Sequence, residues 1–459
     1  MGRIFGTDGV RGIANTELSC KLAMNVGRAA AMVVSEQIGR RPVILIGQDT
    51  RISSDMLRAA LAAGITSVGG DALLAGVLPT PAVSYLVEGG HADAGIMLSA
   101  SHNSYEFNGI KIFGPGGRKL SDAAEFEIER IVLDKAKPYT IRWGWELGRI
   151  RHVENLAEGY IAKLIGAVGD LSGLRVAVDC SNGSAVVTAR EVFARLKADA
   201  HLTHDAPNGI NINRECGSTH MSGLVELVRQ GGYDAGIAFD GDADRCLAVD
   251  ETGGLITGDQ LLCIFAQDMR ERGVLGSDTI VATVMSNLGL QKFARENGFK
   301  LVTTKVGDRY VLEEMLKYGY NLGGEQSGHV ILSDHIATGD GQLTAIALLS
   351  ILKKSGKKLS ELAGQMKVFP QEMINIQADA VMKAALDVDA GAKQIIEDAK
   401  AALGADGRIL VRPSGTEPLI RVMIEGSDKG QITTLAQSVA EQLKERLSHN
   451  ESCKMLEGF

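Results

Sequence analysis

Short apolar runs alternate with helical patterns along most of the chain. Residues 40–51 hold an apolar run rich in Val, Ile and Leu that ends in a polar turn, which predicts a β-strand. Residues 53–70 then place apolar side chains at helical spacing, behind serines that are typical of a helix N-cap, and residues 71–82 return to a strand with a proline-containing turn. This alternation predicts a parallel α/β sheet covered by helices on both faces.

The same pattern starts again at residues 174–185 and at residues 278–290, where a strand again ends in a polar turn before a helix. Residues 397–428 differ, because they predict a helix followed by hairpin-like strands, and thus an α+β module. The tail, residues 448–459, is polar and is expected to be unstructured. A length of 459 residues predicts three or four domains of ordinary size.

Two of these modules contain a short similar segment, which we call the internal echo. Residues 93–103 ("DAGIMLSASHN") and 234–244 ("DAGIAFDGDAD") share their first four residues and continue as an apolar strand and a polar loop. We interpret the echo as a duplication that aligns Ser101 with Asp242. Ligands of open α/β sheets bind at the carboxyl ends of strands, so both loops are candidate site loops.

Composition narrows the possible classes of function. A formal net charge of −8 argues against general attraction to nucleic acid or to an anionic membrane, so an anionic substrate needs a local cluster of basic residues. The longest apolar run, residues 343–352, is too short to span a bilayer and predicts a buried helix. The N-terminus shows no apolar signal-peptide core.

The six cysteines are scattered and contain no C-x-x-C, which indicates a reducing, cytoplasmic environment. Cys216 and His220 are four residues apart, but no second Cys/His pair lies near them in the sequence. The sequence therefore argues against a zinc site.

The clearest chemical signal is "DGDADR" at residues 240–245, which brings Asp240, Asp242 and Asp244 into one short loop. The spacing fits the start of an EF-hand, but Arg245 stands where that loop needs glycine and the flanks are strand-like. Three adjacent carboxylates favour a Mg²⁺ ion, which takes hard oxygen ligands together with phosphate. The alternative is a solvated acidic turn.

"SASHNSYEFNGIK" (residues 99–111) places Ser101 next to His102. Consecutive side chains of a strand point to opposite faces, so this is not a hydrolase-type pair, and alone the stretch indicates a polar turn. Lys111 ends the stretch and is either a surface lysine or a catalytic cation. Arg11 lies in the Gly-rich "FGTDGVRG" near the N-terminus.

Two further motifs suit a sugar phosphate. "RPSGTEPLIR" (412–421) combines two arginines, two hydroxyls and a glycine, which predicts a phosphate cradle without the context of a P-loop. "GGEQSGHV" (323–330) groups Glu325, Ser327 and His329, which suit hydrogen bonds to sugar hydroxyls. A plain turn is the alternative for the first of these motifs.

Together these five pieces resemble the α-D-phosphohexomutase family, over nearly the whole chain and in the family's order. The resemblance implies three similar mixed or parallel α/β domains and a mobile C-terminal α+β domain around a central cleft, with expected boundaries at 1–152, 153–252, 253–367 and 368–459. It also implies movement of a phosphoryl group between two hydroxyls of one hexose.

Within the family, "GEQSGH" and "CGSTH" (216–220) resemble the branch that acts on glucosamine phosphates. The implied reaction interconverts glucosamine 6-phosphate and glucosamine 1-phosphate, which supplies UDP-N-acetylglucosamine and cell-wall precursors. Glucose or mannose phosphate as the main substrate is the alternative.

The resemblance also assigns roles by position. Ser101 is expected to carry a phosphoryl group and to share one Mg²⁺ per subunit with Asp240, Asp242 and Asp244, and a hexosamine 1,6-bisphosphate is the expected priming intermediate. The remaining expected roles are the reacting phosphate for Arg11, His102, Lys111 and Arg245; the sugar for Glu325, Ser327 and His329; and the second phosphate for Arg412, Ser414, Gly415, Thr416 and Arg421. Ser104 departs from the family, which usually has proline there.

Two other classes share some of these features. A metal-dependent phosphatase would use the same carboxylates and cradle but would release inorganic phosphate. A sugar-phosphate or Ca²⁺ binding module would bind without turnover and carry no phosphate on Ser101. The expected partner is a small sugar phosphate, with no nucleic acid and no membrane, and a homodimer is left open.

Overall fold

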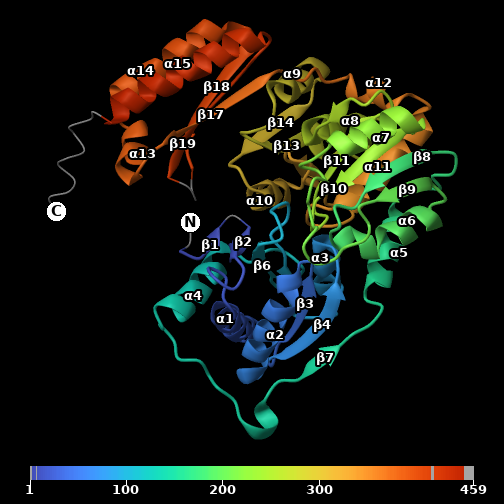
Figure 1. Ribbon diagram of the computed structural model, residues 1–459, viewed down its shortest axis with the longest axis vertical. Helices are drawn as coiled ribbons and strands as arrows, with labels where there is room; N and C mark the ends of the chain where they lie inside the picture. The colour runs from blue at the N-terminus through green and yellow to red at the C-terminus, as the bar shows by residue number, and fades with distance from the viewer. Residues whose placement is uncertain (1–2, 7, 415–417, 449–459) are drawn as a thin grey trace. The chain divides into compact units, whose positions relative to one another are not determined.

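The computed structural model describes residues 3–6, 8–414 and 418–448 (Figure 1). The chain forms two compact units, which are treated separately below. Unit 1 comprises Met1–Met285 with Phe299–Gln365, and unit 2 comprises Ser286–Gly298 with Met366–Phe459. Among the described residues, unit 1 holds three sheets and unit 2 holds one.

The first module of unit 1 is built on a seven-stranded sheet. In spatial order its strands are β1 (Phe5–Gly6), β2 (Gly9–Ile13), β6 (Phe107–Phe113), β5 (Ala94–Leu98), β3 (Val43–Gln48), β4 (Asp71–Val77) and β7 (Ile150–His152). β3 pairs in parallel with β4 and β5, whereas β6 is antiparallel to β5 and β2. The strand predicted within residues 40–51 is β3, and its apolar run is buried because helices cover the centre of the sheet.

The helices of this module are α1 (Cys20–Ile38), α2 (Ile52–Ser67), α3 (Thr80–Glu88) and α4 (Asp122–Leu133). The prediction that serines cap the second helix is wrong. Arg51 takes the N-cap position without a side-chain cap bond, because the serines lie inside the first turn. The Ser54 hydroxyl donates instead to Asp49, 3.2 Å away.

The second module has a five-stranded sheet. Its strands in spatial order are β12 (Leu255–Ile256), β11 (Cys246–Asp250), β10 (Ala235–Phe239), β8 (Arg175–Asp179) and β9 (Asp199–Thr203), and its helices are α5 (Ala157–Ala167), α6 (Ala189–Arg195) and α7 (Ser222–Gly231). β10, β8 and β9 are parallel, and β11 returns antiparallel to β10. This is the mixed α/β pattern of the first module.

The third module has a four-stranded sheet with the order β14 (Lys300–Thr304), β13 (Thr279–Thr283), β15 (Leu322–Gly324) and β16 (Val330–Leu332). Its helices are α8 (Gly258–Glu271), α10 (Asp308–Tyr318), α11 (Gly341–Ser355) and α12 (Leu359–Ala363). The apolar run at residues 343–352 lies in α11 as predicted, and most of that helix is buried. No helix in the described part of the chain is long and apolar enough to cross a membrane.

All three modules of unit 1 place a candidate site loop at the same point of the topology. In each module the loop follows a buried strand that is paired in parallel with an inner strand of the sheet. The strand after the loop then runs antiparallel to that buried strand. The three hairpins are β5–β6 with Ser101, β10–β11 with the three aspartates, and β15–β16 with Glu325. The echo between residues 93–103 and 234–244 therefore reflects equivalent strands, and a third equivalent hairpin carries "GEQSGH".

Unit 2 has a three-stranded antiparallel sheet with the order β17 (Gln371–Gln377), β19 (Leu419–Gly426) and β18 (Gly407–Pro413). Its helices are α9 (Leu288–Asn297), α13 (Ala380–Leu386), α14 (Ala390–Leu403) and α15 (Lys429–Ser448), and α14 and α15 cover one face of the sheet (Figure 1). The predicted α+β character is confirmed. Ser448 ends α15, and the rest of the predicted tail lies outside the described residues.

Candidate active site

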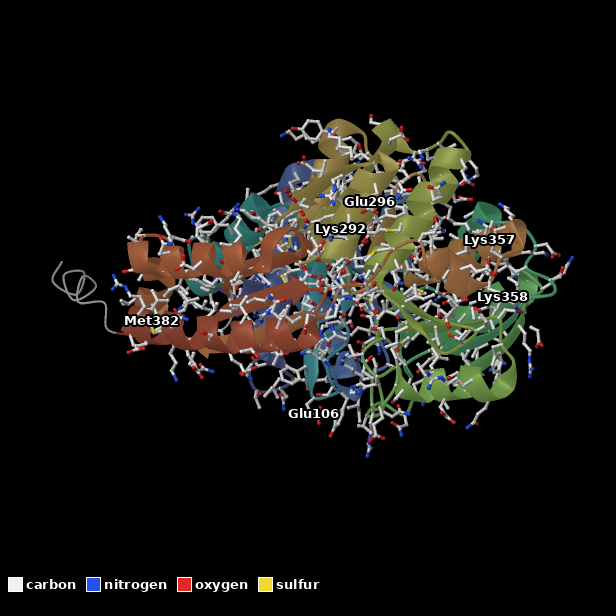
Figure 2. All side chains as sticks on the ribbon, turned by 90° about the horizontal axis from the view of Figure 1, so that it is seen from above. Glu106, Lys292, Glu296, Lys357, Lys358 and Met382 are labelled. Atoms are coloured by element: carbon white, nitrogen blue, oxygen red, sulfur yellow. The ribbon has the colours of Figure 1, made fainter. Side chains whose placement is uncertain are left out.

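Ser101 lies in the loop after β5, at the carboxyl end of a fully buried strand. Its backbone is left-handed, with φ of 52°, a conformation that side-chain-bearing residues adopt rarely and that is enriched at functional sites. The hydroxyl is completely buried and donates a hydrogen bond to Asp240 of the second module. By contrast, Figure 2 shows Glu106, farther along the same loop, directed away from the protein into solvent.

The backbone of the Ser101 loop is held from two sides. Asn213 of the second module donates through Nδ2 to the carbonyl oxygens of Ser101 (2.8 Å) and Asn103 (2.9 Å). Arg51 donates to the same two carbonyls, and its guanidinium is paired with Asp49 in a fully buried ion pair. The orientation of Ser101 is therefore set by residues of two modules.

Asp240, Asp242 and Asp244 lie in the β10–β11 loop and are all buried. One carboxylate oxygen of each lies within 4.8 Å of the others. Gly241 makes the close approach to the first module possible, because a Cβ at this position would lie 2.6 Å from the carbonyl oxygen of Ser101. Strands β10 and β11 flank the loop, whereas an EF-hand loop lies between helices, so the prediction that this is not an EF-hand is confirmed.

The three aspartates fit a hard divalent cation. Oδ1 of Asp242 and Oδ1 of Asp244 are buried and accept no hydrogen bond from any described residue. Burial and the charges of Asp244 and Asp242 raise the pKa of Asp240 well above its usual value. A bound cation would offset the negative charge of the three carboxylates and would give these two oxygens a partner. The cluster can therefore hold a metal ion with oxygen ligands.

Lys111, on β6, is 1% exposed, so it is not the surface lysine of the alternative interpretation. Its Nζ lies 2.7 Å from Asp242 Oδ2, 3.3 Å from Asp244 Oδ2 and 3.0 Å from Asp8 Oδ2. Burial opposes its charge, but these three carboxylates together raise the pKa of Lys111 well above its usual value. Lys111 therefore remains a cation at neutral pH.

A chain of partly buried charged side chains continues from Lys111 into the third module, and sequence analysis missed its members. Lys119 Nζ lies 2.6 Å from Asp8 Oδ1 and 2.6 Å from Asp308 Oδ2, at the start of α10. Their separation along the chain hides them, and the only signal is the place of Asp8 inside "FGTDGVRG". Thr80 was also missed, although its hydroxyl donates to Asp242 Oδ2 at 2.6 Å.

Basic side chains gather around His102, the residue next to Ser101 in the chain. Arg245 donates to Nδ1 of His102 at 3.1 Å, so the proton of the neutral imidazole lies on Nε2. Burial and the charges of Arg245 and Arg11 lower the pKa of His102 to about 4. Arg11 is paired with Asp8, and the Nε atoms of both arginines are buried without a hydrogen-bond acceptor among the described residues. These groups suit an anion.

The third hairpin of unit 1, β15–β16, carries Glu325, Ser327 and His329. It places His329 beside the charged residues Asp244 and Asp308. His329 is 3% exposed and lies between Asp244 (3.6 Å) and Asp308 (3.4 Å). Although burial opposes it, contact with Asp244 and Asp308 raises the pKa of His329. Oε1 of Glu325 accepts from the Gly307 N–H at 3.2 Å, and the buried Ser327 hydroxyl has no hydrogen-bond partner among the described residues.

The predicted phosphate cradle lies in unit 2. Arg412 of β18 stands directly opposite Arg421 of β19 in the antiparallel register. Burial and the Arg421 charge lower the pKa of Arg412. Like charges at directly opposed positions repel, so an anion bound at this hairpin would relieve the repulsion. Ser414 is buried directly after the end of β18, and Gly415 and Thr416 lie outside the described residues.

The fold and the site define a class: a protein of several α/β modules whose buried carboxylates and basic side chains suit a metal ion and phosphoryl groups. Four sequence-family models described as phosphoglucomutase/phosphomannomutase match this chain in order. They are α/β/α domain I at residues 2–138, domain II at 151–254, domain III at 257–369 and the C-terminal domain at 373–442. The chain belongs to the phosphoglucomutase/phosphomannomutase family. The family predicted from its motifs is thereby confirmed.

Curated relatives of high identity over the full length are phosphoglucosamine mutases. The phosphoglucosamine mutase of Acetivibrio thermocellus is 49% identical over 97% of this chain and 100% of its own length. The phosphoglucosamine mutase of Ruminiclostridium cellulolyticum is 50% identical over 98% of this chain and 100% of its own.

Solved structures share the fold. A phosphoglucomutase/phosphomannomutase family protein from Burkholderia thailandensis has a TM-score of 0.80 at 23% identity, covering 97% of this chain and 98% of its own. The N-acetylphosphoglucosamine mutase of Aspergillus fumigatus, solved with GlcNAc-6P and magnesium, has a TM-score of 0.71 at 18% identity. The match covers 96% of this chain and 95% of that protein's chain.

Proposed function

We propose that this protein is a phosphoglucosamine mutase, which interconverts glucosamine 6-phosphate and glucosamine 1-phosphate for amino-sugar synthesis. The observation that carries the proposal is the contact of the buried Ser101 hydroxyl with Asp240, a residue of the acidic triad in another module. Full-length relatives of that name at about half identity support the choice of substrate.

The acidic triad is proposed to hold Mg²⁺ through Asp240, Asp242 and Asp244, with the phosphate of phosphorylated Ser101 as a further ligand. Two buried carboxylate oxygens that accept no hydrogen bond within the described part of the chain support this donor set. When bound, Mg²⁺ would neutralise charge that develops on a transferring phosphoryl group.

Ser101 is proposed to act through the phosphoryl group that it carries. In the first transfer the bond from phosphorus to Ser101 Oγ breaks and a bond to the free sugar hydroxyl forms, which gives a hexosamine 1,6-bisphosphate. The proton lost by that hydroxyl is regained by the released serine oxygen, so no proton is consumed overall. The bisphosphate then turns, and its other phosphoryl group returns to Ser101.

The basic residues have complementary parts in this cycle. Lys111 stays protonated, so it stabilises charge rather than removing a proton. Arg11, Arg245 and neutral His102 are proposed to hold the oxygens of the reacting phosphate. Positioning and charge stabilisation of this kind supply most of the catalysis of phosphoryl transfer.

The sugar is proposed to bind through Glu325, Ser327 and His329. The second phosphate is proposed to bind in unit 2 through Arg412, Ser414, Gly415, Thr416 and Arg421. The four domain boundaries and the homodimer stay predictions.

Product analysis tests the function. The protein is incubated with glucosamine 6-phosphate, Mg²⁺ and a trace of hexose bisphosphate, and the sugar phosphates are separated and quantified. Glucosamine 1-phosphate at equilibrium proportion is expected, without net inorganic phosphate. Release of phosphate would indicate the phosphatase, binding without turnover the binding module, and faster conversion of glucose or mannose phosphate the other branch of the family.

A further inference from the structure

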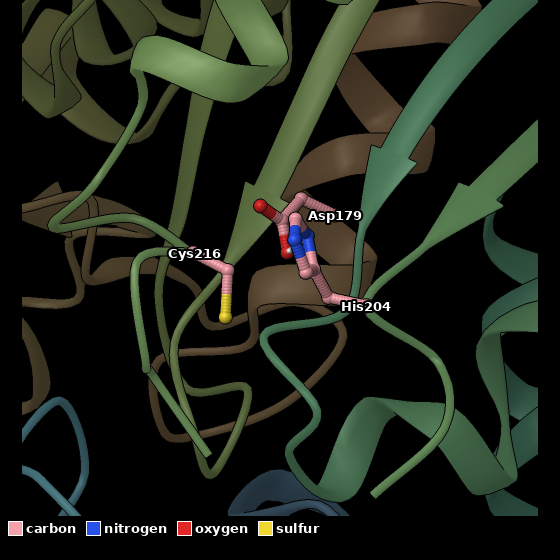
Figure 3. Close-up of side chains that lie close together, drawn as sticks. All are labelled: Asp179, His204 and Cys216. Carbon is pink, nitrogen blue, oxygen red and sulfur yellow. Dashed lines mark ion pairs between the residues drawn. The ribbon is translucent and has the colours of Figure 1, made fainter. Parts of the chain in front are cut away.

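A second cluster of potential metal ligands lies in the second module, outside the acidic triad. Asp179 ends β8, His204 follows β9, and Cys216 lies in the loop that leads toward α7 (Figure 3). One ligand atom of each lies within 4.8 Å of the others. The sequence argument paired Cys216 with His220, but in the folded chain the imidazole beside Cys216 is that of His204, brought there by adjacent parallel strands.

The distances suit a shared cation. Nδ1 of His204 lies 3.2 Å from Oδ1 of Asp179. Two ligands bound tetrahedrally at about 2.0 Å from one Zn²⁺ ion stand about 3.3 Å apart. Cys216 Sγ completes a triangle of one oxygen, one nitrogen and one sulfur. The His204 side chain is 39% exposed, which leaves solvent access for a fourth ligand such as water.

The carboxylate of this cluster is oriented by the backbone. The N–H of Ser181 donates to Oδ1 of Asp179 at 2.8 Å, and the N–H of Gly217 donates to Oδ2 at 2.9 Å. Outer hydrogen bonds of this kind are characteristic of metal-binding carboxylates. Gly217 also requires its special backbone, with φ of 74°, because a Cβ there would lie 2.7 Å from the Phe239 carbonyl oxygen.

Other uses of the cluster fit less well. In a nucleophilic thiol–imidazole pair the ring lies within hydrogen-bond reach of the thiol, but among the described residues the hydrogen bond that Cys216 Sγ accepts comes from Nδ2 of Asn182, at 4.0 Å. Mg²⁺ and Ca²⁺ prefer all-oxygen sites, so a mixed oxygen, nitrogen and sulfur set favours a softer ion.

We propose that Asp179, His204 and Cys216 form a second metal site, which takes a borderline or soft divalent cation such as Zn²⁺. The site is separate from the Asp240–Asp244 triad and goes beyond the proposed mutase activity.

The position of the site gives it a structural consequence. The loop that carries Cys216 also carries Asn213, whose amide donates to the carbonyl oxygens of Ser101 and Asn103. Asn182, which lies next to the cluster, accepts from the Thr50 hydroxyl of the first module through its backbone carbonyl. A cation at the cluster ties together the strand ends and the loop that hold the Ser101 loop in place.

Cobalt tests the proposal, because Co²⁺ bound by a thiolate absorbs through sulfur-to-metal charge transfer and Co²⁺ bound only by oxygen does not. The full chain is titrated with Co²⁺ in saturating Mg²⁺, which occupies the oxygen site. One equivalent giving the thiolate band is expected. Cys216→Ser should abolish the band, and His204→Asn should weaken binding at least tenfold. His204→Asn keeps a residue suited to the left-handed φ of 46° at this position.

Two matched variants serve as controls. Cys20→Ser removes another thiol and Asp242→Asn alters the acidic triad, and both should retain the band. Zn²⁺ should also raise the Tm of the parent and of Cys20→Ser but not of His204→Asn, which keeps the proposal testable if Cys216→Ser folds poorly. A parent protein without the band, or a band that persists in Cys216→Ser or is unchanged in His204→Asn, would overturn the proposal.

Discussion

The chemistry proposed for this protein depends on a few buried charged residues. Asp242 shows this most clearly, because its side chain is fully buried, accepts from Thr80 and Lys111 through Oδ2, and leaves Oδ1 without a hydrogen bond. Burial of a carboxylate is costly unless a cation compensates it. Lys111 compensates the charge at Oδ2 but leaves Oδ1 available to a metal, and complete burial does not fit a solvated acidic turn.

Asp242→Asn tests this interpretation. The amide keeps the shape and can still accept from Thr80 but loses the charge, so Mg²⁺ affinity should fall by at least tenfold and mutase turnover by orders of magnitude. Isothermal titration with Mg²⁺ and the product assay measure both effects. Asp199→Asn, at a strand residue with an exposed side chain, should change neither. Undiminished Mg²⁺ binding in Asp242→Asn would restore the acidic turn.

The ion pairs of Lys119 give a prediction about stability. Lys119→Met preserves much of the side-chain volume but leaves Asp8 and Asp308 without their shared cation. These side chains are 12–20% exposed and Asp8 keeps Lys111 and Arg11 as partners, so loss of the charged hydrogen bonds is expected to cost about 1.5–3 kcal/mol, which chemical denaturation detects. Lys137→Met, whose partner Glu36 is on the surface, should have little effect. Equal stabilities of the two variants would contradict a stabilising role for the ion pairs of Lys119.

At the scale of elements, helix α11 connects the third module to the acidic loop. Its N-cap, Asp340, accepts from Leu343 N at 3.0 Å and from the Tyr160 hydroxyl at 2.9 Å. The N–H of Gly341 donates to Ala243 of the acidic loop, and a Cβ on Gly341 would lie 2.3 Å from the Arg245 carbonyl oxygen. The start of α11 thus supports the loop that carries the aspartates.

Asp340 predicts a pH dependence of stability. Burial raises its pKa to about 7, from an unfolded value of about 4. Between these values the folded state holds a proton that the unfolded state releases, so the stabilisation is full below pH 4 and is lost as the pH rises toward 7. Asp340→Asn keeps the cap but does not titrate.

Thermal unfolding of both proteins across this range measures the effect. The difference in Tm, parent minus variant, should decrease from about pH 4 to pH 7 and then level off. A constant or increasing difference would show that Asp340 is not protonated in the folded protein.

The elements also show what the sequence can predict. Strand β3, helix α11 and the Ser101 and aspartate loops were recognisable because each is continuous in sequence and carries a periodic or motif signal. The cap of α2 was mispredicted because a serine near a helix start does not reveal which residue has the extended backbone. Lys119, Asp308 and the Asp179–His204–Cys216 cluster were missed, because contacts between distant segments leave no local pattern.

At the scale of the whole molecule, the proposed mutase differs from a phosphatase in needing a second phosphate site. Unit 1 holds the metal-site candidates and Ser101, and unit 2 holds the opposed Arg412 and Arg421. Each unit has its own buried apolar core, so a change in one set of groups should leave the other set intact.

Arg421→Ala tests this division of roles. Loss of charge-assisted hydrogen bonds to phosphate should cost roughly 1.5–3 kcal/mol of substrate binding, read as an increase in KM. Phosphoserine at Ser101 should persist, and bisphosphate should escape more readily into solution. Arg446→Ala, at an exposed arginine of the same unit, is the control for general loss of charge. Parent-like kinetics in Arg421→Ala would remove the cradle from the account.

The transfer of the serine phosphoryl group to the sugar is the most direct test of the central claim. The protein is labelled with ³²P at Ser101, freed of excess reagent and mixed with unlabelled glucosamine 6-phosphate and Mg²⁺, and the label is followed on protein, sugar phosphates and inorganic phosphate. The account predicts that the label leaves Ser101 within a few turnovers and appears in glucosamine bisphosphate and monophosphates, while Ser101→Ala takes up none. Label that remains on the protein, or that appears as inorganic phosphate, would contradict a phosphoserine mutase.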